Sequence, residues 1–306
     1  MTHGLPRDPL SGRLTIGFKT TPTDVDWATL DETWAAAGEE PVLAAGWMAD
    51  HLTDATRERG GQAWEAFTLM AALAHRVPGR WLGQAVLANT FRHPAVLAKQ
   101  ATVMDHVTGG RFIVGLGAGW HEGEHEMFGI PLPPIGERIS RLESAVAVLR
   151  ALFGPEARRE PGVSLDDPFY PLRGAVNDPP PVGEPGPPIW LGGQKRRGIS
   201  LAARAASGWL MPGNRSGDTA YLVEKRDAML RALEAAGRDP SGFTFAGQVA
   251  TGSTGEDRRA ALQAAREMVA AGASHVILGL VPRLGPENLR LVVREVAEPL
   301  AEEAGE

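Results

Sequence analysis

The sequence contains no cysteine and no excess of positive charge, and each absence excludes a class of protein. Without thiols the chain forms no disulfide and no thiolate metal site, which fits a reducing compartment. The net charge of -6 and the lack of a long basic run argue against a nucleic-acid partner. No apolar run reaches the roughly 18 residues that a membrane span needs. The opening residues, MTHGLPRDPLSGR, also lack the apolar centre of a signal peptide. We therefore expect a cytoplasmic protein that binds neither nucleic acid nor membrane.

Short apolar runs, in contrast, are abundant. Hydrophobic residues make up 43% of the 306 residues, enough for a large core. Eight brief runs have the character of parallel strands that are covered on both faces. They span residues 14–19, 42–50, 81–88, 112–119, 189–193, 208–213, 243–252 and 275–280. Amphipathic stretches separate them, and a strand followed by a helix eight times over is the pattern of a (β/α)8 TIM barrel. We expect one α/β barrel domain over residues 1–306.

Three of the separating stretches show helical spacing most clearly. Apolar residues recur every three or four positions over 139–153, and Gly154-Pro155 ends that helix. Pro94 suits the first turn of a helix over 94–107, and a last amphipathic helix covers 289–300.

The segment 154–188 interrupts the alternation, because it holds 10 of the 24 prolines and no helical period. We interpret it as a proline-rich insertion after the fourth βα unit, on the side of the βα loops. The stretch VSLDDPFYPLRG within it suggests a small hairpin. Such an excursion would pack over the barrel mouth or against a partner chain; a plain surface loop is the alternative.

The stretch GWHEGEHEMFG, residues 119–129, contains a match to the zinc-binding pattern H-E-x-x-H at His121 to His125. That pattern works on a helix, where both histidines lie on one face. Here the chain leaves the fourth strand through several glycines, and Gly123 lies in the middle, where glycine costs about 1 kcal/mol in a helix. No third ligand can be assigned, so we expect no metal site and keep a zinc hydrolase only as an alternative.

The glycines of the same loop also begin a dinucleotide fingerprint. Gly115-Leu116-Gly117 starts G-x-G-x-x-G, but Trp120 occupies the sixth position and the loop follows the fourth strand. The fingerprint is therefore incomplete. Its physical content remains, since residues without side chains let a flat or phosphorylated group approach the backbone.

A longer stretch, Trp81 to Phe153, contains four motifs in order: the turn NTFRHP, the bend MDHVTGGRF, the loop GLGAGW and the helix start ER. WMADHL at the second strand and PPIWLGGQ at the fifth accompany them. Together these motifs resemble the luciferase-like monooxygenase superfamily, and within it the branch that uses coenzyme F420. The resemblance independently implies the barrel, coenzyme F420 as cofactor with FMN as the alternative, a small-molecule substrate and a homodimer.

The resemblance also implies site residues. Asp50 and His51 match a pair near the reactive edge of the cofactor ring, although a hydrogen-bonded strand cap is their alternative role. The residues implied in cofactor binding are Ala85, Val86, Asn89, Gly117, Ala118, Gly119, Trp120, Gly192, Gly193 and Gln194. At Ala85-Val86 relatives often carry a non-prolyl cis peptide. The cations Lys195, Arg196 and Arg197 follow at a helix start, where an anionic cofactor tail could bind.

For this branch the expected chemistry is hydride transfer between the deazaflavin ring and a small organic substrate. His51 is the first candidate for the accompanying proton transfer, since an imidazole with a pKa of roughly 6.5 suits either direction. His121 is the second. An FMN-dependent monooxygenase, the zinc hydrolase and a barrel that binds cofactor without catalysis are the alternatives.

Overall fold

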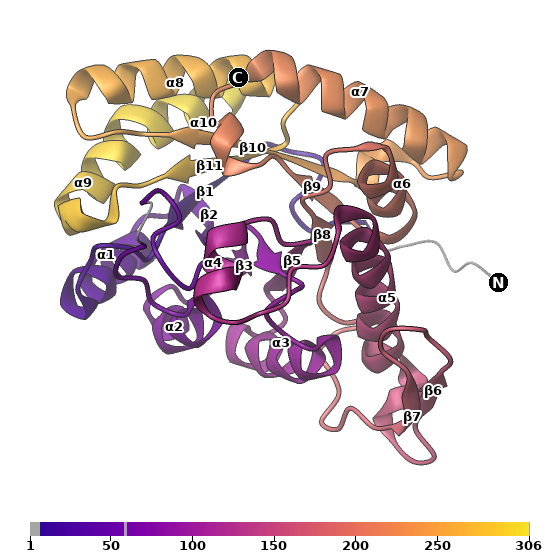
Figure 1. Ribbon diagram of the computed structural model, residues 1–306. Coiled ribbons are helices and arrows are strands. Elements are labelled where there is room, and N and C mark those ends of the chain that lie inside the picture. The colour runs from indigo at the N-terminus through magenta and orange to yellow at the C-terminus, as the bar shows by residue number, and fades with distance from the viewer. Residues whose placement is uncertain (1–6, 58–59, 306) are drawn as a thin grey trace.

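The computed structural model describes residues 7–57 and 60–305 and contains a closed barrel of parallel strands (Figure 1). Its strands are β1 (Thr15–Thr20), β2 (Leu43–Met48), β3 (Trp81–Gln84), β4 (Leu87–Ala88), β5 (Phe112–Gly117), β8 (Ile189–Leu191), β9 (Gly208–Leu210), β10 (Thr244–Ala250) and β11 (His275–Gly279). The order is β3-β2-β1-β11-β10-β9-β8-β5-β4, and a further β3–β5 pairing closes the ring. Because β3 and β4 are consecutive pieces of one expected strand, the barrel has eight staves, and each of the eight predicted strands is confirmed.

Helices surround the barrel (Figure 1). They are α1 (Trp27–Glu39), α2 (Ala66–Leu73), α3 (Pro94–Thr108), α4 (Glu122–Met127), α5 (Ile135–Phe153), α6 (Arg196–Ala205), α7 (Thr219–Ala235), α8 (Gly255–Ala270), α9 (Gly285–Val292), a π-helix (Val293–Ala297) and α10 (Glu298–Gly305). The three helices expected from apolar spacing are confirmed, and Pro94 is the first residue of α3 as predicted. Within the described residues no helix combines the length and the apolar character needed to cross a membrane.

Aromatic side chains pack against one another inside the barrel. Trp47 and Trp190 lie with ring centroids 5.0 Å apart, and Trp47 Nε1 donates to His275 Nε2 at 2.9 Å. A Cβ on Gly17 would lie 2.8 Å from Trp47 Nε1, so this position of β1 accommodates no side chain beside the two rings. Burial lowers the pKa of His275 to about 3, and the ring is therefore neutral.

The N-terminal end of the barrel is closed by a second buried polar group. Asp8 accepts hydrogen bonds from Trp190 Nε1 (2.6 Å), Ser207 Oγ (2.8 Å) and Thr244 Oγ1 (2.7 Å), and from the backbone N–H of Leu10 (3.0 Å). Burial raises the pKa of Asp8 despite these four donors. The carboxylate thus ties the starts of three staves to the chain that precedes β1.

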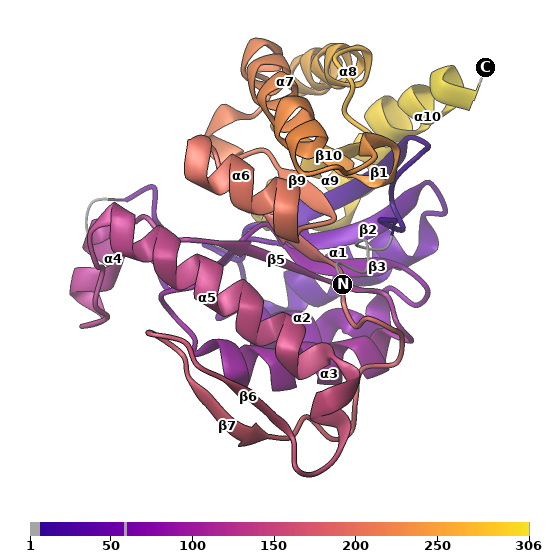
Figure 2. The same ribbon diagram turned by 90° about the vertical axis from the view of Figure 1, so that its right-hand side faces the viewer.

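The proline-rich segment corrects one prediction. It connects the end of α5 to β8 and therefore lies on the αβ side of the barrel, not among the βα loops. The expected hairpin is present as the antiparallel pair β6 (Val163–Leu165) and β7 (Leu172–Ala175). Figures 1 and 2 show this hairpin beside α3 and α5, on the outer surface of the barrel. The polar contacts agree, since Asn177 Nδ2 donates to Thr102 Oγ1 of α3 at 3.1 Å and to Leu152 O of α5 at 3.0 Å.

Candidate active site

The loop that follows β2 is tied to the turn before α3 by a buried ion pair. Asp50, 4% exposed, receives two hydrogen bonds from the Arg92 guanidinium, at 2.7 and 2.9 Å, and one from the N–H of Ala88 at 2.9 Å. Arg92 also contacts Glu65. Burial alone would lower the pKa of Arg92, but the two carboxylates outweigh it and raise that pKa. Asp50 therefore uses its oxygens to hold the loop, as in the alternative role of a hydrogen-bonded strand cap.

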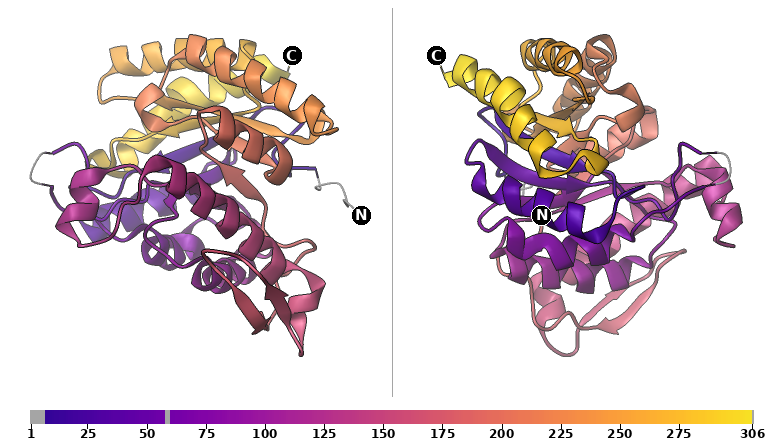
Figure 3. Two further views of the ribbon diagram at one scale, coloured as in Figure 1. Left: turned by 45° about the vertical axis from the view of Figure 1, so that its right-hand side comes forward. Right: turned by 90° about the vertical axis from the view of Figure 1, so that its left-hand side faces the viewer.

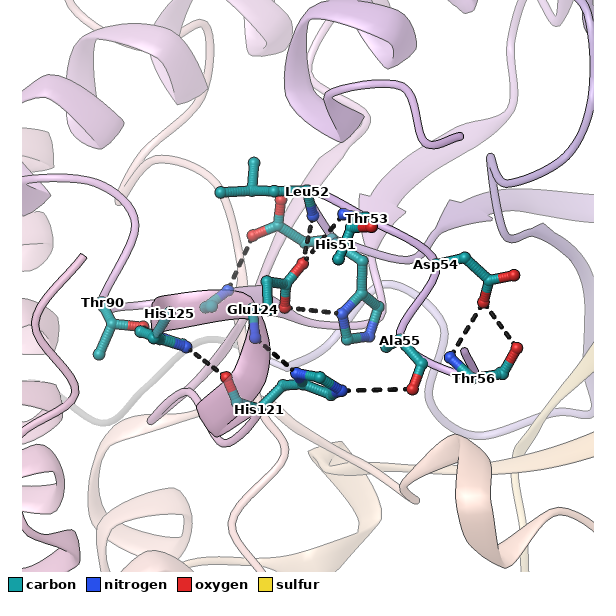
Figure 4. Close-up of polar contacts among 12 residues, drawn as sticks. His51, Leu52, Thr53, Asp54, Ala55, Thr56, Thr90, His121, Glu124 and His125 are labelled. Atoms are coloured by element: carbon teal, nitrogen blue, oxygen red, sulfur yellow. Dashed lines mark hydrogen bonds and ion pairs between the residues drawn. The ribbon is translucent and has the colours of Figure 1, made fainter. Parts of the chain in front are cut away.

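His51, the next residue, faces a carboxylate that comes from α4, the short helix after β5 (Figure 4). Its Nδ1–H donates to Glu124 Oε2 at 3.1 Å, and the side chain of Glu124 is only 1% exposed whereas that of His51 is 21% exposed. The backbone N–H groups of Leu52 and Thr53 also donate to Glu124 Oε1. Burial by itself would raise the pKa of Glu124, but these donors, His51 first, lower it below its usual value. An ionised Glu124 fixes the imidazole with its proton on Nδ1, and Nε2 has no hydrogen-bond partner among the described residues.

The two histidines of the H-E-x-x-H match serve local structure. A helix does form there, α4, but His121 is its N-cap: Nδ1 accepts the N–H of Glu124 at 2.9 Å, while Nε2–H donates to Ala55 O at 3.2 Å. His125 is buried, with Nδ1–H donating to His121 O at 2.7 Å and Nε2 accepting from the Thr90 hydroxyl at 2.7 Å. Over residues 7–57 and 60–305 no three His, Asp or Glu side chains are grouped to hold a metal ion. The geometry gives the zinc alternative no support.

Small residues from three staves meet at the mouth. The Ala85–Val86 peptide bond is cis, the feature that the resemblance associates with this position. A Cβ on Gly117 would lie 2.8 Å from Val86 Cγ2, and one on Gly192 would lie 3.4 Å from the same atom. The predicted residues Ala85, Val86, Gly117 and Gly192 thus lie together, half-buried, and form a shallow cradle without long side chains. We call them the small-residue cradle.

Asn89 lies at the edge of this cradle with unused bonding capacity. Its N–H donates to Gly117 O at 2.9 Å, and the residue is 4% exposed. Its side-chain oxygen Oδ1 is buried and has no hydrogen-bond partner among the described residues. A buried acceptor of this kind is costly unless a ligand donates to it.

The remaining residues of the glycine loop lie at the rim. Gly119 has a φ of 79°, a conformation that favours glycine, and its carbonyl accepts from Arg138 at 2.6 Å. Trp120 is 65% exposed, and its ring stands edge-on to that of His51 at a centroid distance of 5.9 Å. Ala118 is half-buried directly after β5. An exposed indole beside His51 offers an apolar wall at the opening.

The Gly192-Gly193 turn leads, as expected, into a helix. Trp209 Nε1 donates to Gly193 O at 2.7 Å, and Tyr221 donates to Gln194 Oε1 at 2.8 Å. Helix α6 begins at Arg196 without a side-chain cap, so its first N–H groups are available. Of the three cations, Arg197 pairs with Glu143 on α5, whereas Lys195 and Arg196 line a groove of about 470 Å³ between α6 and α7.

Residues 22–302 match the family described as Luciferase-like monooxygenase. The chain belongs to this family. A ketoreductase of Mycobacterium bovis, named for phthiodiolone and phenolphthiodiolone dimycocerosates, is 31% identical over 71% of the chain. The F420-dependent glucose-6-phosphate dehydrogenase of Kribbella flavida is 36% identical over 51% of the chain. The alignments span 60% of the first relative and 45% of the second.

Solved structures share the barrel of this luciferase-like protein. An F420-dependent secondary alcohol dehydrogenase, solved with an F420-acetone adduct, superposes with a TM-score of 0.74 at 18% identity and covers 93% of this chain and 99% of its own. The F420-dependent tetrahydromethanopterin reductase of Methanopyrus kandleri reaches 0.75 at 14% identity, covering 94% and 100%. At these identities the likeness shows the fold.

Three residues near the predicted site make contacts that the sequence does not predict. Arg92 holds Asp50. Glu124 anchors His51. Lys19, at the end of β1, carries no signal of a site in the sequence. No local pattern marks these contacts, because each partner lies on another stave or loop.

Proposed function

We propose that this protein is an F420-dependent oxidoreductase that transfers a hydride between the cofactor ring and the carbon of a carbonyl or alcohol group in a small organic substrate. The observation that carries this proposal is the His51–Glu124 pair, in which Glu124 accepts from His51 Nδ1 and the imidazole ring lies beside Trp120 of the glycine loop. The names of the similar proteins, a ketoreductase and F420-dependent dehydrogenases, support a carbonyl–alcohol couple.

The chain's residues fit a flat cofactor. Gly117 and Gly192 let a ring approach Val86, where side chains would block it. Asn89 Oδ1, which has no partner in the described part of the chain, suits a ring N–H group. When bound, the deazaflavin supplies or accepts the hydride. The uncapped start of α6, with Lys195 and Arg196, would hold its phosphodiester and acidic tail.

His51 would move the proton. Glu124 accepts from Nδ1, so the neutral ring would take a proton from an alcohol at Nε2, and the doubly protonated ring would give one to a carbonyl oxygen. Asp50 acts indirectly, because its bonds to Arg92 and Ala88 set the path of the chain that carries His51. Trp120 would limit access of water to the opening.

Equilibrium binding of F420 and of FMN, each followed by fluorescence, tests the cofactor. We expect tight binding of F420 and weak binding of FMN. Preference for FMN, with oxygen consumption once it is reduced, would replace the proposal by a monooxygenase. Binding of neither would overturn both. Binding of F420 without turnover of any ketone, aldehyde or secondary alcohol would favour the non-catalytic barrel.

We also propose that the protein forms a homodimer. Helix α3 exposes Val96, Val103 and Val107, each more than half exposed, on a surface that a second copy could cover. Sedimentation equilibrium of the wild type and of Val103→Glu tests this. A dimer weakened by the substitution is the expected result, and a monomeric wild type would contradict it.

A further inference from the structure

The mouth of the barrel contains a cation that the proposed cofactor site does not use. Lys19 is the last interior-facing residue of β1: Gly17, two positions earlier, faces Trp47 and His275 inside the barrel, and side chains of a strand alternate with period two. Lys19 Nζ donates to Gln248 Oε1 of β10, and Gln248 Nε2 in turn donates to Met211 O. Gln248 is therefore oriented by the backbone and presents its oxygen to the ammonium.

The ammonium has donors to spare. It carries three N–H groups, of which Gln248 uses one. Among the residues that the structure describes, no carboxylate lies within 4.0 Å of it. On β11, the stave between β1 and β10, Gly279 pairs with Lys19 and carries no side chain. A cation in the barrel interior with spare donors and no counter-charge among the described residues indicates an anionic or strongly polar ligand.

Its place in the ring is opposite the small-residue cradle. In the closed order β3-β2-β1-β11-β10-β9-β8-β5, β1 is four staves from β8 and β10 is four staves from β3. Lys19 therefore faces the stave that ends at Gly192, and Gln248 faces the one that ends at Ala85. A substrate bound between a cofactor ring in the small-residue cradle and the Lys19–Gln248 pair would face the ring on one side and the pair on the other.

We propose that the Lys19 ammonium, oriented by Gln248, binds the oxygen of the substrate's carbonyl or alcohol group and stabilises the negative charge that develops there. The inference rests on the proposed function and names the group that recognises its substrate. When the carbonyl carbon receives a hydride, the electron pair of the C=O π bond moves to the oxygen. Lys19 donates a hydrogen bond to that oxygen, and the proton comes from Nε2 of His51 when its ring is protonated at both nitrogens. A donor aimed at such charge in a poorly hydrated site is worth about 100-fold to 1000-fold in kcat.

The state of the lysine supports this role. Burial lowers its pKa from 10.5 to about 8, so at neutral pH the side chain is charged, though weakly hydrated. Above pH 8 the cation is lost. Turnover of a ketone should then fall as pH rises through 8, and this limb should be absent in a variant without the lysine.

The first arm of the test needs no substrate. The chain has four lysines, Lys19, Lys99, Lys195 and Lys225, so reductive methylation with 13C-formaldehyde gives few signals, which single substitutions assign. Acetate serves as a probe for an oxygen anion. We expect the Lys19 signal to titrate near pH 8 and to shift saturably with acetate, while that of exposed Lys99 does neither. In Gln248→Glu, where a carboxylate would neutralise the pair, the acetate response should be lost although Lys19 remains.

The second arm uses the F420-loaded protein and the ketones or alcohols that it turns over. Lys19→Met should lower kcat about 100-fold and leave the Kd for F420 within twofold, whereas Lys99→Met should change neither. A Lys19 signal that titrates with the others, or an acetate response shared by all lysines, would overturn the inference, as would unchanged turnover in folded Lys19→Met. Failure of the wild type to bind F420 would instead overturn the proposed function, so the two failures are distinct.

Discussion

The two ends of the barrel differ in whether the hydrogen bonds of their polar side chains are complete. At the N-terminal end Asp8 receives four donors, and the rings above it fill the interior. At the C-terminal end three residues have hydrogen-bonding groups that the described part of the chain does not use. They are the spare N–H donors of Lys19, the side-chain oxygen of Asn89 and Nε2 of His51. Figure 3 shows how α4, which carries Glu124, projects beyond the other helices at this end.

The difference separates stability from activity. A buried polar group stabilises a fold only when its partners are complete, because an unpaired one costs about 1–3 kcal/mol. The N-terminal end meets that condition. The mouth does not, and in a TIM barrel the mouth is the end where substrates bind. Substitutions at the two ends should therefore have different signatures.

The largest expected effect is at the mouth. His51→Asn should lower kcat with a ketone or alcohol about 100-fold to 10 000-fold, the range of general acid–base catalysis. F420 affinity and the free energy of unfolding should change little, since His51 is one donor at a partly exposed position. The exposed His75→Asn is the matched control. Unchanged kcat in His51→Asn would show that activity does not depend on this residue of the mouth.

At the opposite end, Asp8→Ala should lower the free energy of unfolding by about 3 kcal/mol, because three buried donors would lose their acceptor. Urea denaturation measures this, and F420 affinity of the folded fraction should be unchanged. Thr254→Ala, which removes the capping box of α8, gives a reference of about 1 kcal/mol. A smaller loss in Asp8→Ala than in the reference would show that the carboxylate is dispensable.

A side chain can be added to the small-residue cradle without changing the polar residues around Asp8 or around His51. Gly117→Ala places a Cβ 2.8 Å from Val86 Cγ2, so the cradle must shift, and the Kd for F420 should rise by about tenfold or more. Gly136→Ala, whose Cβ would meet nothing within 4 Å, is the control. Fluorescence titration of both variants decides whether the cradle contacts the ring. Equal affinities would place the ring elsewhere.

The smallest effect is a pH dependence of stability. Burial holds the pKa of Lys19 at about 8 in the folded protein, against its ordinary value of 10.5, so the folded protein binds this proton more weakly than the unfolded chain does. Stability should therefore rise between pH 8 and 10.5, by about 1 kcal/mol after solvent screening. Denaturation curves across this range should show the rise in wild type and a smaller one in Lys19→Met. Parallel curves would mean that Lys19 is not buried enough to be weakly protonated.

Much of the fold could be predicted from local pattern. The brief apolar runs mark strands because parallel staves are covered on both faces, and Pro94 marks the start of α3 because its missing N–H is not needed there. The proline-rich segment is misplaced by the same kind of reasoning. A run without period shows that no helix forms, but it does not show which end of the barrel the loop lies on.

The sequence by itself determined the barrel, its staves and, through its resemblance to a family, the glycines and the histidine expected at the mouth. Only the tertiary structure decided which side chains form contacts. Arg92 pairs with Asp50, and Glu124 accepts from His51. Lys19 donates to Gln248 past Gly279, which has no side chain. Strand and helix signals depend on neighbours in sequence, whereas these contacts join residues 42, 73 and 229 positions apart, which closure of the barrel brings together.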